Sequence, residues 1–305
     1  MRRARVIINP AAGAGRTAKV GSSVTQSLHG VDIAPDFVLT KSPGHASILA
    51  FEAARRGSDL VIAVGGDGTV HEVANGLLRH PSPPPLGLIQ TGTGSDLSRV
   101  LALPRDIDSQ VAIIARAEPR KFDVGRCSYR TSKGRAESAF LLLAGIGLSA
   151  RVVKKSMRIK RLGRTLPYLV STCSEIFKPQ PCIGQFTIDN VTELLTILDL
   201  MVLNVPWVGG GMYLAPGADP QDGNLNTLTT LQQSRWELIN LLFRLYSGSH
   251  LKRSGVRYGR TKRISVQSET RLPVALDGEF VGYSPVQCWV VPGALSILTE
   301  EVRIQ

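Results

Sequence analysis

Residues 60–69 constrain the fold of this chain more than any other segment. Residues 60–64 form a continuous apolar run of the kind that is buried in a parallel sheet. The turn GGDGT (residues 65–69) follows at once, and apolar residues then recur at helical spacing up to Leu78. The segment therefore predicts a buried strand, a tight glycine turn and an amphipathic helix.

The same alternation extends along the first part of the chain. Further strand candidates lie at residues 5–8, 36–39 and 86–89, and helix candidates lie at residues 17–28, 45–56, 69–80 and 95–103. Strands that alternate with helices in this way predict a doubly wound parallel sheet.

After about Val124 the pattern changes and strand candidates dominate. They lie at residues 139–144, 185–188, 194–205, 264–267, 273–276 and 286–291, with helical stretches near residues 149–177 and 235–246. We therefore predict an α/β fold in two domains, a nucleotide-binding α/β domain of residues 1–124 and a mostly antiparallel β domain of residues 125–296. The tail, residues 297–305, is expected to pack back on the first domain.

Composition narrows the classes of partner. The 305 residues are 43% hydrophobic and 20% charged, an ordinary globular balance, and the net charge of +12 calls for an anionic partner. Aromatic residues make up only 6%, and no zinc-ligand spacing is present, which disfavours nucleic acid. No apolar run reaches the roughly 20 residues of a membrane-spanning helix. The four cysteines are consistent with reduced thiols, so we expect a cytoplasmic location.

Two further loops repeat the arrangement of strand, glycine turn and helix. Residues 9–16 (NPAAGAGR) follow the first strand candidate, and residues 91–96 (TGTGSD) follow the fourth. In a parallel sheet such loops meet at the carboxyl edge, where glycine lets the backbone approach a ligand and helix N-termini favour anions. One such turn alone is more often a plain connection with Asp67 as helix N-cap. Three together predict a nucleotide site, with Arg16 or Lys19 within reach of phosphate oxygens.

Two acidic motifs lie in the second domain. The motif LDGE (residues 276–279) holds the Asp-Gly pair of a hairpin turn, and its two carboxylates are also able to take a proton from a hydroxyl or to hold a metal. Asp219, Asp222 and Asn224 share a second turn, and hard oxygen ligands of this kind suit Mg²⁺ or Ca²⁺. Each motif alone is most simply a surface turn.

Taken in order along nearly the whole chain, these motifs resemble the diacylglycerol kinase catalytic family, especially its soluble bacterial lipid kinases, with relatives among sphingosine and ceramide kinases. GGDGT is shared with NAD kinases and, more loosely, with phosphofructokinases, but its combination with LDGE and the Asp-Gly turn is more specific. The chain departs from the family pattern at Ser95, where an Asn is usual, and at Asn226, where an Asp is common.

The resemblance implies an ATP site made by the three loops and the end of the second strand. With Arg16 added from its place in the first loop, the expected ATP contacts are Asn9, Pro10, Ala11, Ala12, Gly13, Arg16, Thr40, Gly65, Gly66, Asp67, Gly68, Thr69, Val70, His71, Gly92 and Thr93. We expect His71 to be a helix-surface residue rather than a selector of substrate.

The resemblance also implies the catalytic acids and a metal. The carboxylate of LDGE is implied as the general base, which points to Glu279 with Asp277 beside it. The residues themselves leave open which of the two takes the proton, and Asp67 is expected to orient the metal or the hydroxyl. A structural Mg²⁺ is implied at Asp219, Asp222 and the backbone of Asn224. The active site is expected in the cleft between the domains, and replacing Asp277 or Glu279 by Ala is expected to abolish activity without unfolding the chain.

The expected function is that of an ATP- and Mg²⁺-dependent lipid kinase that converts diacylglycerol to phosphatidic acid. Two basic runs, residues 151–164 and 252–263, predict peripheral binding to an anionic membrane surface. The alternatives are a sphingoid-base or ceramide kinase, an enzyme like NAD kinase, and a catalytically weak basic membrane-binding module. A homodimer is left open.

Overall fold

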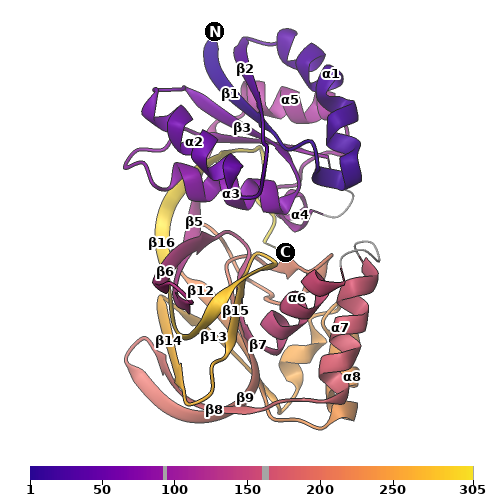
Figure 1. Cartoon of the computed structure of the whole chain (residues 1–305), viewed down its shortest axis with the longest axis vertical. Helices are drawn as coiled ribbons and strands as arrows, with labels where there is room; N and C mark the ends of the chain where they lie inside the picture. The colour runs from indigo at the N-terminus through magenta and orange to yellow at the C-terminus, as the bar shows by residue number, and fades with distance from the viewer. Residues whose placement is uncertain (92–94, 160–164, 305) are drawn as a thin grey trace. The chain divides into compact units, whose positions relative to one another are not determined.

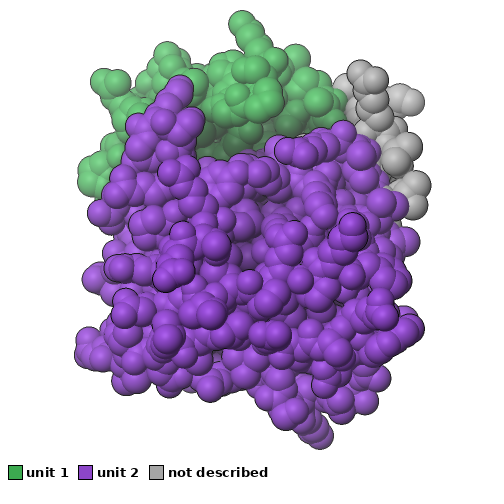
Figure 2. Space-filling model, turned by 60° about the horizontal axis from the view of Figure 1, so that its bottom comes forward, with its two compact units in different colours: residues 1–123, 292–303 green, residues 124–291, 304–305 purple. Residues whose placement is uncertain are grey.

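The computed structural model of the chain describes residues 1–91, 95–159 and 165–304. The chain divides into two compact units, which Figure 2 colours separately. Unit 1 contains Met1–Asp123 and Pro292–Arg303, and unit 2 contains Val124–Val291 with the C-terminal end. The chain passes from unit 1 to unit 2 within β5 (Pro119–Thr131) and returns within β16 (Glu279–Leu298).

Unit 1 is built on a parallel sheet with helices on both faces (Figure 1). Its strands are β1 (Arg2–Ile8), β2 (Ile33–Leu39), β3 (Leu60–Gly65) and β4 (Leu86–Gln90), in the spatial order β2-β1-β3-β4. Its helices are η1 (Ala12–Gly15), α1 (Arg16–His29), α2 (His45–Arg55), α3 (Asp67–Leu77), α4 (Asp96–Val100) and α5 (Ile107–Arg116). The sheet runs outward in both directions from β1 and β3, so the predicted doubly wound α/β fold is confirmed.

The core of unit 1 follows from the alternation of side chains along its strands. Ile62, Val64 and Ile89 point to one face, where they pack against Leu28 of α1 and Val111 of α5. On the other face α2 and α3 pack side by side. This packing fixes the sheet, and with it the places where the strands end.

Unit 2 is mostly antiparallel β, which confirms the predicted second domain type. Besides β5 and β16, its strands are β6 (Gly134–Phe140), β7 (Leu143–Gly147), β8 (Cys182–Ile188), β9 (Val191–Leu203), β10 (Trp207–Val208), β11 (Met212–Tyr213), β12 (Leu225–Leu231), β13 (Val256–Thr261), β14 (Arg263–Ser268) and β15 (Pro273–Leu276). The pairings β9-β7-β15-β16-β14-β8-β9 close into a ring around an apolar core.

Unit 2 also carries a group of helices. They are α6 (Leu148–Arg158), α7 (Thr165–Phe177), α8 (Arg235–Arg244) and the short η3 (Ser249–Lys252). The predicted helical stretch at residues 149–177 therefore contains two helices, and residues 160–164 lie outside the described residues. Among the described residues, no helix is both long and apolar enough to cross a bilayer.

Asp199 of β9 fixes the start of α6. Its Oδ1 accepts hydrogen bonds from the backbone N of Ser149 at 3.0 Å and from Ser149 Oγ at 2.8 Å. The Asp199 side chain is buried, and this burial raises its pKa to about 6, against an ordinary value of 3.8. The buried charge therefore opposes the stability that the two hydrogen bonds give.

This raised pKa predicts a pH-dependent stability. The folded state binds the Asp199 proton more tightly than the unfolded state, so its contribution is complete below pH 3.8 and is lost as the pH rises through about 6. Asn at position 199 keeps an oxygen acceptor without the charge. We expect the stability of Asp199→Asn relative to the parent chain to improve by roughly 2–3 kcal/mol between pH 4 and pH 7.

Urea unfolding at a series of pH values measures this shift. Asp189→Asn is the matched control because the pKa of Asp189 moves the other way: burial acts to raise it, but hydrogen bonds from Thr261, Lys262 and Arg263 hold it below its ordinary value. That variant should lose relative stability as the pH rises. Parallel pH profiles for Asp199→Asn and the parent would contradict the assignment.

Candidate functional site

The register of the parallel strands brings the ends of β1, β3 and β4 to one edge of the unit 1 sheet. Ile8 lies opposite Val64, and Val64 lies opposite Ile89. Backbone hydrogen bonds continue this alignment into the loops: the N of Asn9 donates to the O of Val64, and the N of Thr91 donates to the O of Gly65, each at 3.1 Å. The first and third loops therefore flank the GGDGT turn.

The GGDGT turn depends on a close contact that only glycine allows. A Cβ atom on Gly65 would lie 2.5 Å from Thr69 Oγ1, and that hydroxyl also accepts a hydrogen bond of 3.0 Å from Asn9 Nδ2. Gly66, at the N-cap of α3, has no side chain with which to cap the helix, and a Cβ there would meet open space. A phosphate group is the kind of partner that the N–H groups of such a first turn bind.

Asp67 connects the GGDGT turn to the third loop. Its carboxylate accepts a short hydrogen bond from Ser95 Oγ and another, of 3.2 Å, from the backbone N of Asp96. Ser95 Oγ in turn caps α4 by accepting from the N of Ser98 at 3.2 Å. The departure at Ser95 thus places a hydroxyl, in place of the usual amide, where it donates to Asp67.

Most of the residues expected at the ATP site lie along this edge. Asn9 to Gly13 follow β1, Gly65 ends β3 and Gly66 to Thr69 follow it, and Thr40 follows β2, where its N donates to the O of Ile8 at 2.9 Å. Gly92, Thr93 and the side chain of Arg16 lie outside what the structure describes.

The expectation that His71 lies on the helix surface is wrong. His71 is only 6% exposed, and neighbouring Val70 is buried, because this side of α3 faces inward. Asn75, one turn further along α3, donates from Nδ2 to the backbone O of His71 at 3.0 Å.

Two residues of the edge were not found from the sequence. Glu72 accepts hydrogen bonds from the N of Gly44 at 2.8 Å and the N of Ala46 at 3.1 Å, and so ties the loop after Thr40 to α3. Gln90 ends β4, and among the described residues neither its side-chain oxygen nor its nitrogen has a hydrogen-bond partner although both atoms are buried. The two hydrogen bonds of Glu72 come from backbone groups of a distant segment, so no spacing in the sequence could reveal them.

In unit 2, the side chain of Asp277 accepts hydrogen bonds from the backbone of residues 141–143. Asp277 and Gly278 both have positive φ angles, 47° and 83°, and turn the chain between β15 and β16. The Asp277 carboxylate accepts hydrogen bonds from three successive backbone N–H groups, those of Leu141 and Leu142 at 2.8 Å and of Leu143 at 3.0 Å. Both carboxylate oxygens are therefore engaged in holding residues 141–143.

Glu279 has different surroundings. It is exposed, and among the described residues its carboxylate has no hydrogen-bond or ion-pair partner. The adjacent Phe280 packs against α6, where Lys154 Nζ lies 5.1 Å from the Phe280 ring centre and donates a 2.5 Å hydrogen bond to Tyr283 Oη. Glu279 is thus an accessible acid on a well-packed hairpin.

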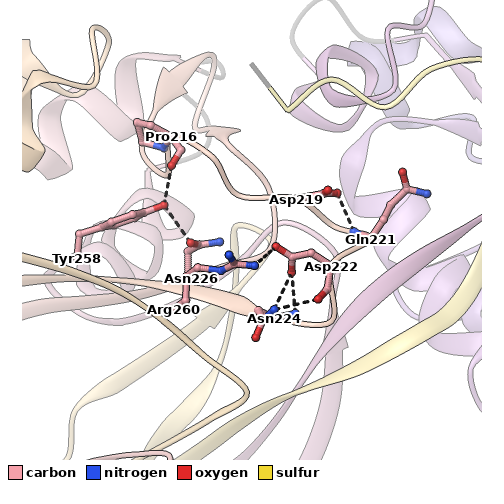
Figure 3. A network of polar contacts seen from close by, with 8 residues as sticks. All are labelled: Pro216, Asp219, Gln221, Asp222, Asn224, Asn226, Tyr258 and Arg260. Atoms are coloured by element: carbon pink, nitrogen blue, oxygen red, sulfur yellow. Dashed lines mark hydrogen bonds and ion pairs between the residues drawn. The ribbon is translucent and has the colours of Figure 1, made fainter.

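The predicted metal-binding turn is shown in Figure 3. Asp222 Oδ1 accepts hydrogen bonds from the backbone N of Asn224 at 2.8 Å and from its Nδ2 at 3.3 Å, and Asp222 Oδ2 forms a short ion pair with Arg260. Asp219 Oδ1 accepts from the N of Gln221 at 2.9 Å. Oxygen donors of this type suit Mg²⁺, and here one oxygen of Asp222 is paired with Arg260.

Asn226 serves the fold at this position. Its side chain is 2% exposed, and its Oδ1 lies 3.0 Å from the hydroxyl of Tyr258, which also lies 3.0 Å from the O of Pro216 (Figure 3). Burial raises the pKa of Tyr258 to about 12, so the hydroxyl keeps its proton. The departure at Asn226 therefore provides an uncharged acceptor for a half-buried phenol.

Fold and loops together define an α/β protein of NAD kinase-like fold with a C-terminal antiparallel β domain. The family model described as diacylglycerol kinase catalytic domain matches residues 3–127, and the model described as YegS C-terminal NAD kinase beta sandwich-like domain matches residues 143–299. The chain belongs to the family of diacylglycerol kinase-like lipid kinases.

Individual relatives match over almost the whole chain. A relative from Bacillus subtilis (strain 168) that is named as the lipid kinase YtlR, without an established activity, is 30% identical to this chain. The match covers 96% of this chain and 98% of the relative. A diacylglycerol kinase of the same organism is 29% identical, with 93% and 92% covered. A solved structure described as a diacylglycerol kinase from Bacillus anthracis str. Sterne has a TM-score of 0.74 at 22% identity, covering 98% of this chain and 97% of its own, and supports the fold.

Proposed function

We propose that this chain transfers the γ-phosphoryl group of ATP to the hydroxyl of diacylglycerol and so forms phosphatidic acid. The proposal rests on the carboxyl edge of the unit 1 sheet, where hydrogen bonds of Asp67 connect the GGDGT turn to the third loop. It also rests on the membership of the chain in the diacylglycerol kinase family. Positioning and charge neutralisation supply most of the catalysis of phosphoryl transfer, and glycine loops with a helix N-terminus supply both.

We assign separate roles to the residues of the site. The first turn of α3 and the loops after β1 and β4 bind the phosphates, and ATP supplies the transferable phosphoryl group. Glu279 accepts the proton of the lipid hydroxyl, because it is the accessible acid of its hairpin. Asp277 is a positioning residue, since its oxygens bind three backbone N–H groups. Asp67 orients the metal or the hydroxyl.

A diacylglycerol kinase must reach a substrate that is held in a bilayer. The net charge of +12 favours a negatively charged leaflet. We therefore propose peripheral association of the chain with the cytoplasmic face of an anionic membrane.

The structural Mg²⁺ is proposed at Asp219, Asp222 and the backbone O of Asn224, where Arg260 already pairs with Asp222. We expect Arg260→Gln to lower the melting temperature in EDTA and to enlarge the rise in melting temperature that Mg²⁺ produces, because Asp222 then lacks its cationic partner. Arg257→Gln is the control, since Arg257 lies on the same strand and pairs with Glu193 instead. If Mg²⁺ left the melting temperature unchanged in both the parent and Arg260→Gln, the assignment of a metal site to this turn would be wrong.

The test of the activity is direct. The purified chain is incubated with radiolabelled ATP, Mg²⁺ and vesicles that contain diacylglycerol, with sphingosine, ceramide and NAD offered in parallel reactions. We expect labelled phosphatidic acid as the main product. Label in a sphingoid phosphate, in NADP or in no product at all would replace the proposal with the corresponding alternative.

A further inference from the structure

Three helices of unit 2 form one layer. α7 packs against both α6 and α8, and Figure 1 shows the three along one side of the unit. Their inward side is apolar: Ile176 of α7 and Leu238 and Leu241 of α8 pack together with Leu198 of β9. The outward side of such a layer is normally polar in a protein that contacts only water.

Here the outward side is also apolar. Eight of the fifteen exposed large apolar side chains of the described residues lie on these helices or directly after α8, namely Met157, Tyr168, Leu169, Val170, Phe177, Trp236, Phe243 and Tyr246. Such clustering on one layer marks an interaction surface, whereas single exposed apolar side chains need no explanation.

The most exposed of these side chains are aromatic and lie on α8. Trp236 is 68% exposed and Phe243 is 75% exposed, and their separation of two helical turns puts both on the same outward stripe. Leu169 and Phe177 form a similar stripe on α7, with the exposed thiol of Cys173 between them. We call Leu169, Phe177, Trp236, Phe243 and Tyr246 the aromatic face.

The charges around the aromatic face are almost all positive. The helices α6, α7 and α8 contain only two acids: Glu175 is buried and paired with Arg151 and Lys155, and Glu237 caps α8 through Ser234. The exposed cations nearby in the chain are Arg158, Lys178, Arg235, Lys252 and Arg253.

The structure also changes the role of the basic runs predicted from the sequence. Of the first run, Arg151 and Lys155 serve the Glu175 ion pair and Lys154 serves Tyr283. Of the second run, Arg257 pairs with Glu193 and Arg260 with Asp222. These five cations have partners within the protein, whereas Lys252 and Arg253 of the second run are exposed, so net charge alone does not mark where the chain meets a membrane.

We propose that the aromatic face is the surface by which the chain docks on an anionic bilayer. Trp236 and Phe243 enter the interfacial layer, where aromatic rings are favoured, and the surrounding cations contact lipid headgroups. A second copy of the chain is a poorer occupant because it would bring cations against cations. The inference deepens the proposed function, on which it rests, by naming the surface through which the lipid is reached.

The binding test uses vesicles of phosphatidylcholine with and without phosphatidylglycerol. We expect Trp236→Ala/Phe243→Ala to weaken co-sedimentation with the anionic vesicles about tenfold or more, because two large apolar side chains no longer enter the interface. The matched control is Val191→Ala/Leu194→Ala, which removes two similarly exposed apolar side chains from β9 of the same unit. Circular dichroism confirms that both variants fold.

Cys173 gives a second readout without any substitution. It is the exposed one of the four cysteines, the other three being buried, so a disulfide reagent such as DTNB should modify it first in the folded chain. We expect anionic vesicles to slow this modification in the parent and to have little effect in the Trp236→Ala/Phe243→Ala variant. Equal modification rates with and without bound vesicles would place the face away from the bilayer.

Kinase assays separate this inference from the proposed function. With a water-soluble short-chain diacylglycerol the double variant should match the parent, while its turnover of vesicle-held diacylglycerol should fall with its binding. A parent chain that binds vesicles through the aromatic face but phosphorylates no lipid supports the inference and defeats the proposed function. Unchanged vesicle binding in the double variant, or a dimer in solution that the double substitution dissociates, overturns the inference.

Discussion

Glu279→Gln should lower the turnover of diacylglycerol by about 10²- to 10⁴-fold, the usual contribution of a positioned general base. Gln matches Glu in size but does not take up a proton at neutral pH. Because the Glu279 side chain is exposed and its carboxylate has no partner among the described residues, the melting temperature should stay within about 1 °C of the parent. Initial rates at saturating ATP measure the loss.

Glu269→Gln is the matched control for this prediction. Glu269 is another exposed glutamate of unit 2, outside the hairpin, and its replacement should leave turnover unchanged. If Glu279→Gln kept normal turnover, the proton would have to go elsewhere, and Glu279 would lose its assigned role.

Asp277→Ala, unlike Glu279→Gln, should lower the stability of the fold. Removing the carboxylate leaves the N–H groups of residues 141–143 without their acceptor and puts Ala into a backbone conformation with φ of 47°, which non-glycine residues seldom adopt. We expect a loss of unfolding free energy on the order of 3 kcal/mol, measured by urea denaturation. The expectation that this substitution abolishes activity without unfolding the chain is thereby joined by a predicted loss of stability.

Asp277→Asn separates the role of the acceptor from the role of the charge. Asn tolerates the left-handed conformation and keeps Oδ1, which accepts from Leu142 and Leu143. Its stability should therefore lie between the parent and Asp277→Ala, and its turnover should exceed that of Glu279→Gln. An Asn variant as stable as the parent but fully inactive would make Asp277 the base instead of a positioning residue.

The sequence could predict what is local in this molecule. Each glycine turn, the strand before it and the helix after it are neighbours in the chain, so their pattern and spacing are sufficient to predict an α/β unit with three loops at one edge. The division between Asp277 and Glu279 could not be predicted in this way, because the partners of Asp277 lie as far as 136 residues away. The ion pair of Arg260 with Asp222 and the burial of His71 depend in the same way on tertiary packing.

The surface was harder still to predict. Basic runs are visible in the sequence, but whether a cation faces solvent or an internal partner is decided by packing, as Glu175 shows for Arg151 and Lys155. The outward aromatic residues of α8 alternate in the sequence with its buried leucines. The sequence therefore shows a helix that is apolar on both sides, and only the structure shows which apolar residues face inward.

The ring of strands in unit 2 has a consequence for biosynthesis. β16 pairs with both β14 and β15 and so completes the ring, yet it begins only at Glu279 and follows all the other strands of the ring in the chain. Until β16 has left the ribosome, β14 and β15 each expose an edge that can pair with another chain. A chain truncated before Glu279, and so without β16, should therefore aggregate during expression instead of yielding a smaller soluble unit.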